Sequence, residues 1–291
     1  MKSLLSRFLC LCLACVLLFG LGSPVAFADG EEGAEEAAEP AITAVRVYVD
    51  GLLTARAYRC GGEALLPLET LCGLLGLDCT TEWDAESGVL RMSAHGFSLE
   101  ADAGQAYFCV NGRYLYNPAG FRLIDGKACF PAEPAARIFT LDIRDADDGE
   151  SLELDTAEMA VLSGGVTYYS DTYGSEELFW LARIISAEAG HQSMDGLIGV
   201  GNVVLNRMKS EAYPDSIHDV IFDGFQFEPV QDGHVYREPT EASVIAACLC
   251  LEGYNTAGES LYFIDPRYAD DSWLRYNRTF VVTLGTHDFY A

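Results

Sequence analysis

The chain has 291 residues, of which 44 are acidic and 18 are basic, so its formal net charge is −26 at pH 7. A chain this acidic is repelled by phosphate backbones and anionic lipid surfaces, which excludes nucleic acid as a partner and disfavours membranes. A largely uncharged glycan remains compatible with this charge. The length suits two domains at the usual ~100–200 residues each.

The first 28 residues predict a secretory signal peptide. Lys2 and Arg7 precede an apolar run of 14 residues, Phe8 to Leu21, and a small-residue cleavage site ends at Ala28. The run is too short to span a bilayer comfortably. We therefore expect cleavage after Ala28, a secreted product without a membrane anchor, and a net charge of −28 on that product, because only two basic residues leave.

Residues 29–40 are acidic and rich in alanine, which predicts a solvated linker. A period of two then begins, in which Val45, Val47 and Val49 alternate with polar residues and lead into Asp50-Gly51. This pattern predicts a strand that enters a tight turn.

A weak internal repeat has an offset of 64 residues. Leu66-Pro67-Leu68-Glu69 recurs as Phe130-Pro131-Ala132-Glu133, and each copy predicts a short helix after the proline, then a polar turn and a strand (Val89–Ser93 and Leu152–Asp155). Other strand-like segments lie between the copies, with a turn at Asn111-Gly112. These features predict a small α+β repeat domain.

Residues 41–157 resemble the copper amine oxidase N-terminal-like domain, a small α+β module of secreted bacterial proteins. Its name does not imply a metal here, because His95 is the one histidine in this region. Two roles remain open for it, an inert spacer and an attachment module for wall or glycan. Residues 158–174, which contain Gly164-Gly165 and Gly174, are expected to form a linker.

The most informative residue is Glu188, near the end of a segment with helical periodicity. Leu181, Ile184 and Ile185 form the apolar stripe of this segment, and Glu188 falls on the same face. Burial and the negative end of the helix dipole, near Gly190, both raise a carboxyl pKa, which favours a proton donor at neutral pH. The alternative is a structural glutamate paired with Arg183 or Arg207.

The rest of this half also shows helix and strand signals. Helices are expected over Leu197–Arg207, Pro214–Ile221 and Pro239–Glu252, and strands over Leu261–Ile264 and Thr279–Leu284. Gly199 and Gly201 in the first of these helices allow close backbone approach, at some cost in helix propensity.

Several separated motifs make residues 176–291 similar to the SleB/CwlJ-type cell wall hydrolases, the family of spore-cortex-lytic enzymes. The motifs are Ala187-Glu188-Ala189-Gly190, Gly199-Val-Gly-Asn-Val-Val-Leu-Asn-Arg207, Phe225-Gln-Phe-Glu-Pro-Val230, Leu261-Tyr-Phe-Ile-Asp-Pro266 and Leu284-Gly-Thr-His-Asp-Phe-Tyr290. The resemblance implies a mainly helical, lysozyme-like domain over residues 175–291 with a short C-terminal sheet. It also implies action on peptidoglycan in the cell wall or spore cortex, with Glu188 as the catalytic residue.

One motif departs from the pattern of some members, which have Glu-Ala-Arg-Gly-Glu where this chain has Glu188-Ala-Gly-His-Gln192. No role of that arginine or second glutamate transfers. The peptidoglycan-binding repeat found at the N-terminus of some members is also absent, and the α+β repeat domain stands in its place.

A single motif-defined carboxyl favours lytic transglycosylase chemistry, in which the C6 hydroxyl of muramic acid replaces water as nucleophile. A hydrolytic muramidase would need a second carboxyl group, and Asp223, Glu228, Asp232 and Asp265 are the candidates. Substrate contacts are expected from side chains that stack on sugars or hydrogen-bond to them, namely Asn202, Gln226, Phe227 and Tyr262. The third alternative is a wall-binding protein without catalysis.

Other classes fit poorly. A cysteine peptidase needs an exposed nucleophile near a histidine, but Cys248 and Cys250 fall in mid-helix. The histidines lack the spacing of a zinc site, so we expect neither a metal nor another cofactor. Beyond the signal peptide, seven cysteines without dense spacing predict buried thiols more than a disulfide framework. The oligomeric state is left open.

Overall fold

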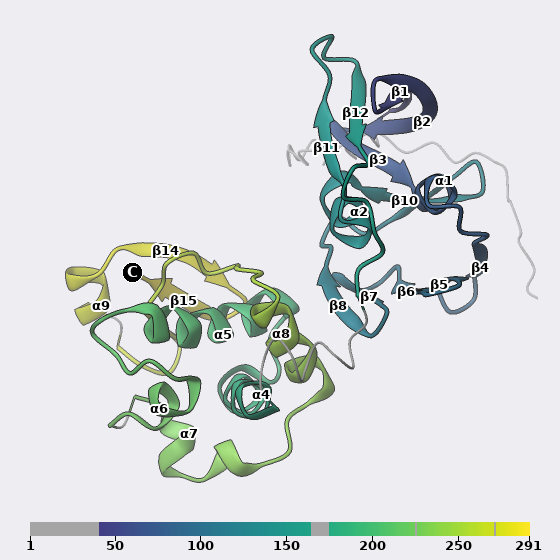
Figure 1. Ribbon diagram of the computed structural model, residues 1–291. Helices are drawn as coiled ribbons and strands as arrows, with labels where there is room; N and C mark the ends of the chain where they lie inside the picture. The colour runs from purple at the N-terminus through teal and green to yellow at the C-terminus, as the bar shows by residue number, and fades with distance from the viewer. Residues whose placement is uncertain (1–40, 164–174, 225, 271) are drawn as a thin grey trace, which may run out of the picture. The chain divides into compact units, whose positions relative to one another are not determined.

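The computed structural model describes residues 41–163, 175–224, 226–270 and 272–291. The predicted signal peptide, the acidic linker and most of the linker at 158–174 lie outside these residues. Helices and strands both occur throughout the described part, so the α+β class is confirmed (Figure 1).

Strands dominate the N-terminal half. Seven form a sheet in the order β11-β12-β1-β2-β3-β10-β9, and five form an antiparallel meander in the order β4-β5-β6-β7-β8. Within the first sheet, β1 and β12 pair in parallel, and the other neighbours are antiparallel. The bounds are β1 (Ile42–Val49), β2 (Leu52–Cys60), β3 (Glu63–Pro67), β4 (Thr80–Asp84), β5 (Val89–Ala94), β6 (Phe97–Asp102), β7 (Tyr107–Val110), β8 (Arg113–Tyr116), β9 (Arg122–Ile124), β10 (Lys127–Pro131), β11 (Asp142–Asp145) and β12 (Ser151–Asp155).

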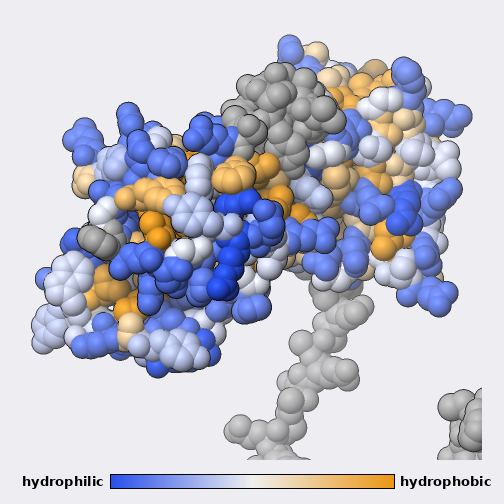
Figure 2. All heavy atoms as spheres, turned by 90° about the horizontal axis from the view of Figure 1, so that it is seen from below, coloured by the Kyte–Doolittle hydropathy of each residue, from blue (hydrophilic) through white to orange (hydrophobic). Residues whose placement is uncertain are grey.

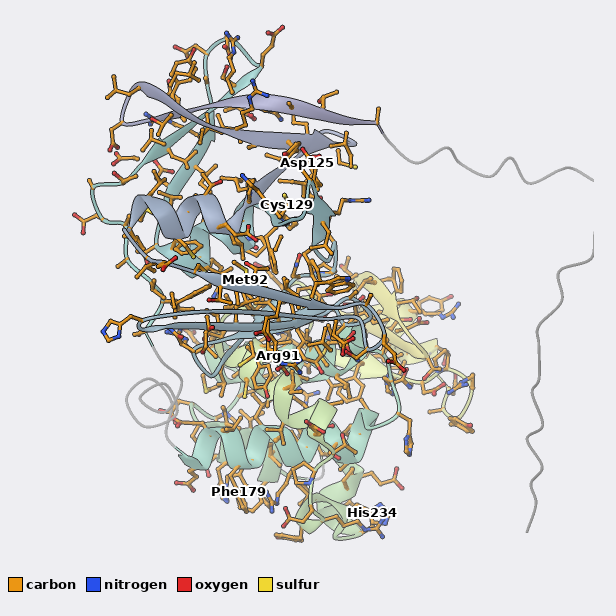
Figure 3. All side chains as sticks on the ribbon, turned by 90° about the vertical axis from the view of Figure 1, so that its right-hand side faces the viewer. Arg91, Met92, Asp125, Cys129, Phe179 and His234 are labelled. Atoms are coloured by element: carbon orange, nitrogen blue, oxygen red, sulfur yellow. The ribbon has the colours of Figure 1, made fainter. Side chains whose placement is uncertain are left out.

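Local sequence explains these strands and their turns. The alternating valines of β1 are buried, as their period of two predicted. Asp50 and Gly51 both have positive φ, +51° and +80°, which suits the two-residue turns that connect twisted hairpin strands. In β5, buried Met92 and exposed Arg91 lie on opposite faces of the strand (Figure 3).

The two copies of the repeat lie next to each other in the first sheet. Strand β3 leads through Pro67 into α1 (Leu68–Leu74), and β10 leads through Pro131 into α2 (Ala132–Phe139). The two strands pair antiparallel, with Pro67 opposite Cys129 and Pro131 opposite Leu65. Both helices bury their apolar sides in one core shared with the two sheets.

The C-terminal half combines helices with one small sheet. Its helices are α4 (Ser175–Ala189), α5 (Met194–Lys209), α6 (Ile217–Phe222), α7 (Glu228–Gln231), α8 (Glu241–Leu251) and α9 (Ser272–Asn277), with a 3₁₀ turn at His234–Tyr236. A small antiparallel sheet has the order β13-β15-β14, with β13 (Tyr262–Ile264), β14 (Phe280–Leu284) and β15 (His287–Tyr290). The expected helices and the strands at β13 and β14 are confirmed, whereas α7, α9 and β15 were not expected as regular elements.

Helices α4, α5 and α8 pack against one another, and the small sheet lies beside α5 (Figure 1). The predicted stripe of α4 is fully buried: Leu181, Ile184 and Ile185 have no exposed surface. Together with the apolar residues of α5 and α8, they form a core separate from that of the N-terminal half.

Two glycines allow this close packing. A Cβ atom built at Gly199 would lie 2.8 Å from side-chain atoms of Leu284 and Phe289, in the small sheet. One built at Gly201 would lie 2.6 Å from the sulfur of Cys250 and 2.8 Å from Ile185. The predicted reason for both glycines, close approach of α5 to its neighbours, is therefore confirmed.

Gly201→Ala is expected to lower the free energy of unfolding by about 1–3 kcal/mol, because the new methyl group overpacks the contact between α4, α5 and α8. Gly73→Ala is the matched control, since its Cβ in α1 would meet nothing within 4 Å. That change should be neutral or stabilising by up to ~1 kcal/mol. Denaturant unfolding measures both, and a Gly201→Ala variant as stable as the parent contradicts the packing argument.

Hydrophilic side chains cover most of the face seen in Figure 2, in keeping with the acidic composition. No helix in the described ranges is both long and apolar enough to cross a membrane. Cys72, Cys79, Cys109, Cys129 and Cys250 are free thiols, as the spacing of the cysteines predicted.

Candidate functional site

A cavity of about 750 Å³ lies at the C-terminal end of α4. Helix α4 and the following turn form one side, α7 and the 3₁₀ turn form another, and β13 with the start of β15 completes the wall. The polar and ionisable side chains that line it include Glu188, His191, Gln192, Glu228, His234, Asp265, Arg267, Tyr268 and His287. His234 lies on the segment after α7, as Figure 3 shows.

Glu188 is a half-buried wall residue of this cavity. Arg183 instead pairs with Glu238, at 3.0 Å, and places its guanidinium 3.6 Å from the centre of the Phe179 ring. The Nε of Arg207 donates to the carbonyl of Leu261. Within the described residues neither arginine forms a salt bridge with Glu188, although the charge of Arg207 acts on it.

The environment of Glu188 raises its pKa to about 7. Burial is the largest cause, because it disfavours the ionised form, and the nearby carboxyl of Glu228 adds to it. The positive charge of Arg207 opposes the shift, and Asp232 adds to it weakly. Glu188 can therefore hold a proton near neutral pH and release it within the same range.

Arg207 is a buried cation whose charge lowers the pKa of Glu188. Its side chain is 5% exposed, and its guanidinium lies 5.2 Å, 5.1 Å and 5.9 Å from the ring centres of Tyr213, Phe227 and Tyr262. Aromatic faces stabilise a cation in such positions. Its Nη1 is buried without a hydrogen-bond partner among the described residues.

Asp265 lies in the same wall and is held by several donors. Arg267 donates to its carboxylate through Nε and Nη2, at 2.9 Å and 2.6 Å, and Thr286 donates its hydroxyl at 2.9 Å. These bonds, those from Arg267 first, hold the pKa of Asp265 well below its usual range. A carboxylate stabilised in this way is a poor base.

Gln192 braces this arrangement from the end of the turn after α4. Its Nε2 donates to the Thr286 hydroxyl at 2.7 Å, and its Oε1 accepts the Thr286 backbone N–H at 3.1 Å. The Thr286 hydroxyl in turn donates to Asp265, so its oxygen needs a donor as its second partner. The side-chain amide of Gln192 supplies that donor.

Of the four candidate second carboxyl groups, Glu228 fits best. It lines the cavity, is exposed, and acts electrostatically on Glu188. Asp265 is committed to Arg267 and Thr286. Asp232 accepts the His234 backbone N–H and lies 3.1 Å from its ring nitrogen, outside the cavity lining, and Asp223 lines a different cavity.

The four residues expected to contact substrate are not brought together with Glu188. Asn202 is buried, and its amide bonds to the carbonyl of Tyr254 and the N–H of Thr256. Phe227 is 2% exposed and packs on Phe263. Neither side chain lines the Glu188 cavity, so both positions serve the core.

Gln226 and Tyr262 line a second cavity, of about 490 Å³. Sequence reasoning did not anticipate Arg267 or Gln192 in the wall of the Glu188 cavity, nor the bonds of Thr286 to Gln192 and Asp265. The one available signal was the short Asp265-Pro-Arg267 spacing, which favours a local ion pair.

No group of three or more His, Cys, Asp or Glu side chains is placed to hold a metal ion in the ranges that the structure describes.

The model of the Cell Wall Hydrolase family matches residues 191–290, beginning three residues after Glu188. These residues thus form a cell wall hydrolase domain, of the SleB/CwlJ type that the motifs indicated.

Individual relatives are similar over about 40% of the chain. The spore cortex-lytic enzyme of Bacillus subtilis (strain 168) is 29% identical over 117 residues, 40% of this chain and 38% of that one. The enzyme of the same name from Halalkalibacterium halodurans is 30% identical, over 35% of its length. The cell wall hydrolase CwlJ of B. subtilis is 28% identical over 122 residues, which cover 85% of it. The chain thus spans less than half the length of these two spore cortex-lytic enzymes.

A solved structure described as the catalytic domain of the germination-specific lytic transglycosylase SleB from Bacillus anthracis is 27% identical. The match covers 42% of this chain and 98% of that one, with a TM-score of 0.39.

Proposed function

We propose that this protein is a secreted peptidoglycan-cleaving enzyme that cuts the glycan strand between N-acetylmuramic acid and N-acetylglucosamine. Glu188 is its general acid and base, and the reaction is that of a lytic transglycosylase. The observation that carries the proposal is a single half-buried carboxyl with a pKa of about 7 in the wall of a large cavity. General acids work best when their pKa lies near the working pH.

The cavity supports a reaction in two proton transfers. Glu188 first gives its proton to the glycosidic oxygen, the bond from this oxygen to the anomeric carbon of muramic acid breaks, and the glucosamine leaves with a free hydroxyl. The Glu188 carboxylate then takes the proton of the muramic C6 hydroxyl, whose oxygen bonds to the anomeric carbon. The product is a 1,6-anhydro ring, no water is consumed, and Glu188 regains its proton.

The positive charge of Arg207 and the carboxyl of Glu228 act on Glu188 in opposite directions. Arg207 stabilises the anion formed after the first transfer, whereas Glu228 favours the protonated state that starts the reaction. Their combined effect keeps both states accessible near neutral pH.

The similarity to spore cortex-lytic enzymes points to the spore cortex as the wall and to germination as the occasion. We infer that the enzyme acts outside the cytoplasmic membrane, because the expected signal peptide would direct its secretion. The N-terminal α+β half is proposed to anchor the enzyme on insoluble wall, with an inert spacer as the alternative.

A turnover assay on purified sacculi tests this function against wall binding without catalysis. We expect many moles of soluble glycan fragments released per mole of protein. Stoichiometric binding without release would reject the enzyme and leave the wall-binding alternative.

Hydrolysis is the second candidate, because Glu228 occupies the same cavity as Glu188. Glu228→Gln separates the two mechanisms. Under the transglycosylase mechanism its maximal rate should stay within about threefold of the parent, and the pKa of Glu188 should fall because a neighbouring negative charge is lost. Loss of about 100-fold or more at every pH, the effect of removing a general base, would instead favour hydrolysis.

A further inference from the structure

We propose that the second cavity, lined by Tyr213, Asp223, Gln226, Tyr262 and Arg278, is a sugar subsite that binds an N-acetylhexosamine of the glycan strand away from the cleaved bond. The inference rests on the proposed function, since it names where the same substrate extends.

The lining of this cavity has the mixed chemistry that a neutral, N-acetylated sugar requires. Tyr213 and Tyr262 line the cavity and are partly exposed, and an aromatic ring can pack on the C–H surface of a pyranose. Gln226 and Arg278 supply donors for an acetamido carbonyl, and Asp223 supplies an acceptor for ring hydroxyls. Ligand sites in general combine apolar walls with a few convergent polar groups.

The guanidinium of Arg278 and the ring of Tyr262 hold each other in place without a ligand. Arg278 donates through Nη2 to the Tyr262 hydroxyl at 2.9 Å and through Nη1 to the carbonyl of Asn277 at 3.1 Å. Its guanidinium lies 4.7 Å from the centre of the Tyr262 ring and 5.2 Å from that of Trp273. Because the guanidinium has five N–H donors, others remain for a ligand.

Two structural links place this cavity next to the Glu188 cavity. Gln226 in one wall is two residues before Glu228 in the other. Arg207 is the second link, since its buried guanidinium lies against the rings of Tyr213 and Tyr262 and its charge acts on Glu188. A glycan strand bound at Glu188 can therefore continue into the second cavity.

This arrangement predicts that the enzyme favours long glycan strands. We expect kcat/KM on soluble, uncrosslinked glycan fragments to rise at least ~10-fold between tetrasaccharide and octasaccharide, which corresponds to about 1.4 kcal/mol. In Tyr262→Ala and in Arg278→Gln the ratio of the two kcat/KM values should fall to about one. Tyr276→Ala is the matched control, because this tyrosine is 92% exposed and lines neither cavity, and it should keep the parental ratio.

A parental ratio in both cavity variants, with their folds verified by circular dichroism, would overturn the subsite while leaving the cleavage activity established.

Trp273 provides a second readout that does not depend on turnover or on those variants. Its ring centre lies 6.3 Å from that of Tyr262, so a sugar bound there should change its fluorescence. Glu188→Gln titrated with octasaccharide should give a saturable change that disappears when Trp273→Phe is added. No change would overturn the subsite. If the fluorescence changes but the parent protein does not cleave peptidoglycan, the subsite is retained and the proposed cleavage is rejected.

Discussion

Glu188→Gln is expected to lower kcat on peptidoglycan by at least ~100-fold, the lower end of the contribution of a general acid. The substitution keeps the volume of the side chain and removes the proton that the leaving oxygen must receive. Fragment release from purified sacculi, measured as reducing or anhydro ends per unit time, checks the effect. Because the carboxylate forms no salt bridge within the described residues, the fold should survive the change.

The matched control is Glu259→Gln, the same chemical change at an exposed residue that lines neither cavity. It should retain parental activity. If Glu188→Gln keeps activity within tenfold of the parent, Glu188 is not the catalyst and the assignment of the cavity as the active site fails.

The second large effect concerns pH. A general acid must be protonated, and the pKa of Glu188 is raised to about 7, chiefly by burial. The kcat/KM should therefore be retained below pH 7 and fall about tenfold per pH unit above it, to roughly 1% at pH 9. A profile measured on soluble fragments from pH 5 to 9 tests this, and a flat profile up to pH 9 would contradict the role.

The raised pKa of Glu188 also affects stability. Its pH dependence has the opposite sign to that of a salt-bridged carboxylate, whose pKa is lowered by folding. An unfolded glutamate ionises near its ordinary pKa, whereas folded Glu188 keeps its proton up to about pH 7. Between these values the folded state binds more protons, so the free energy of unfolding falls as pH rises. Glu188→Gln should lack this component, which a comparison of denaturant unfolding at pH 5 and pH 8 detects.

Features governed by local sequence were predictable. The apolar stripe of α4 and the position of Glu188 beside it follow from a period of 3.6 residues, and the Asp50-Gly51 turn follows from residues that tolerate positive φ. Gly199 and Gly201 indicated close packing of α5 correctly, because few other reasons favour glycine inside a helix.

The composition of the cavity wall was not predictable in the same way. Gln192 and Thr286 meet across 94 positions of the chain, and Thr286 lies in the turn between the paired strands β14 and β15. Periodicity also gives little signal for α7, which has only four residues. Asn202 was expected at the substrate because its amide can hydrogen-bond to a sugar. Its burial depends on Tyr254 and Thr256, which lie in a distant loop.

Product analysis after digestion in ¹⁸O-water tests the central claim most directly. Glu188 acting as acid and then base on the C6 hydroxyl uses no solvent oxygen at the cleaved anomeric carbon. We predict by mass spectrometry that new muramic ends are 1,6-anhydro and unlabelled, and that Glu188→Gln produces none above background. New muramic reducing ends that carry ¹⁸O would contradict the transglycosylase mechanism and identify the enzyme as a hydrolytic muramidase, with Glu228 as the group that activates water.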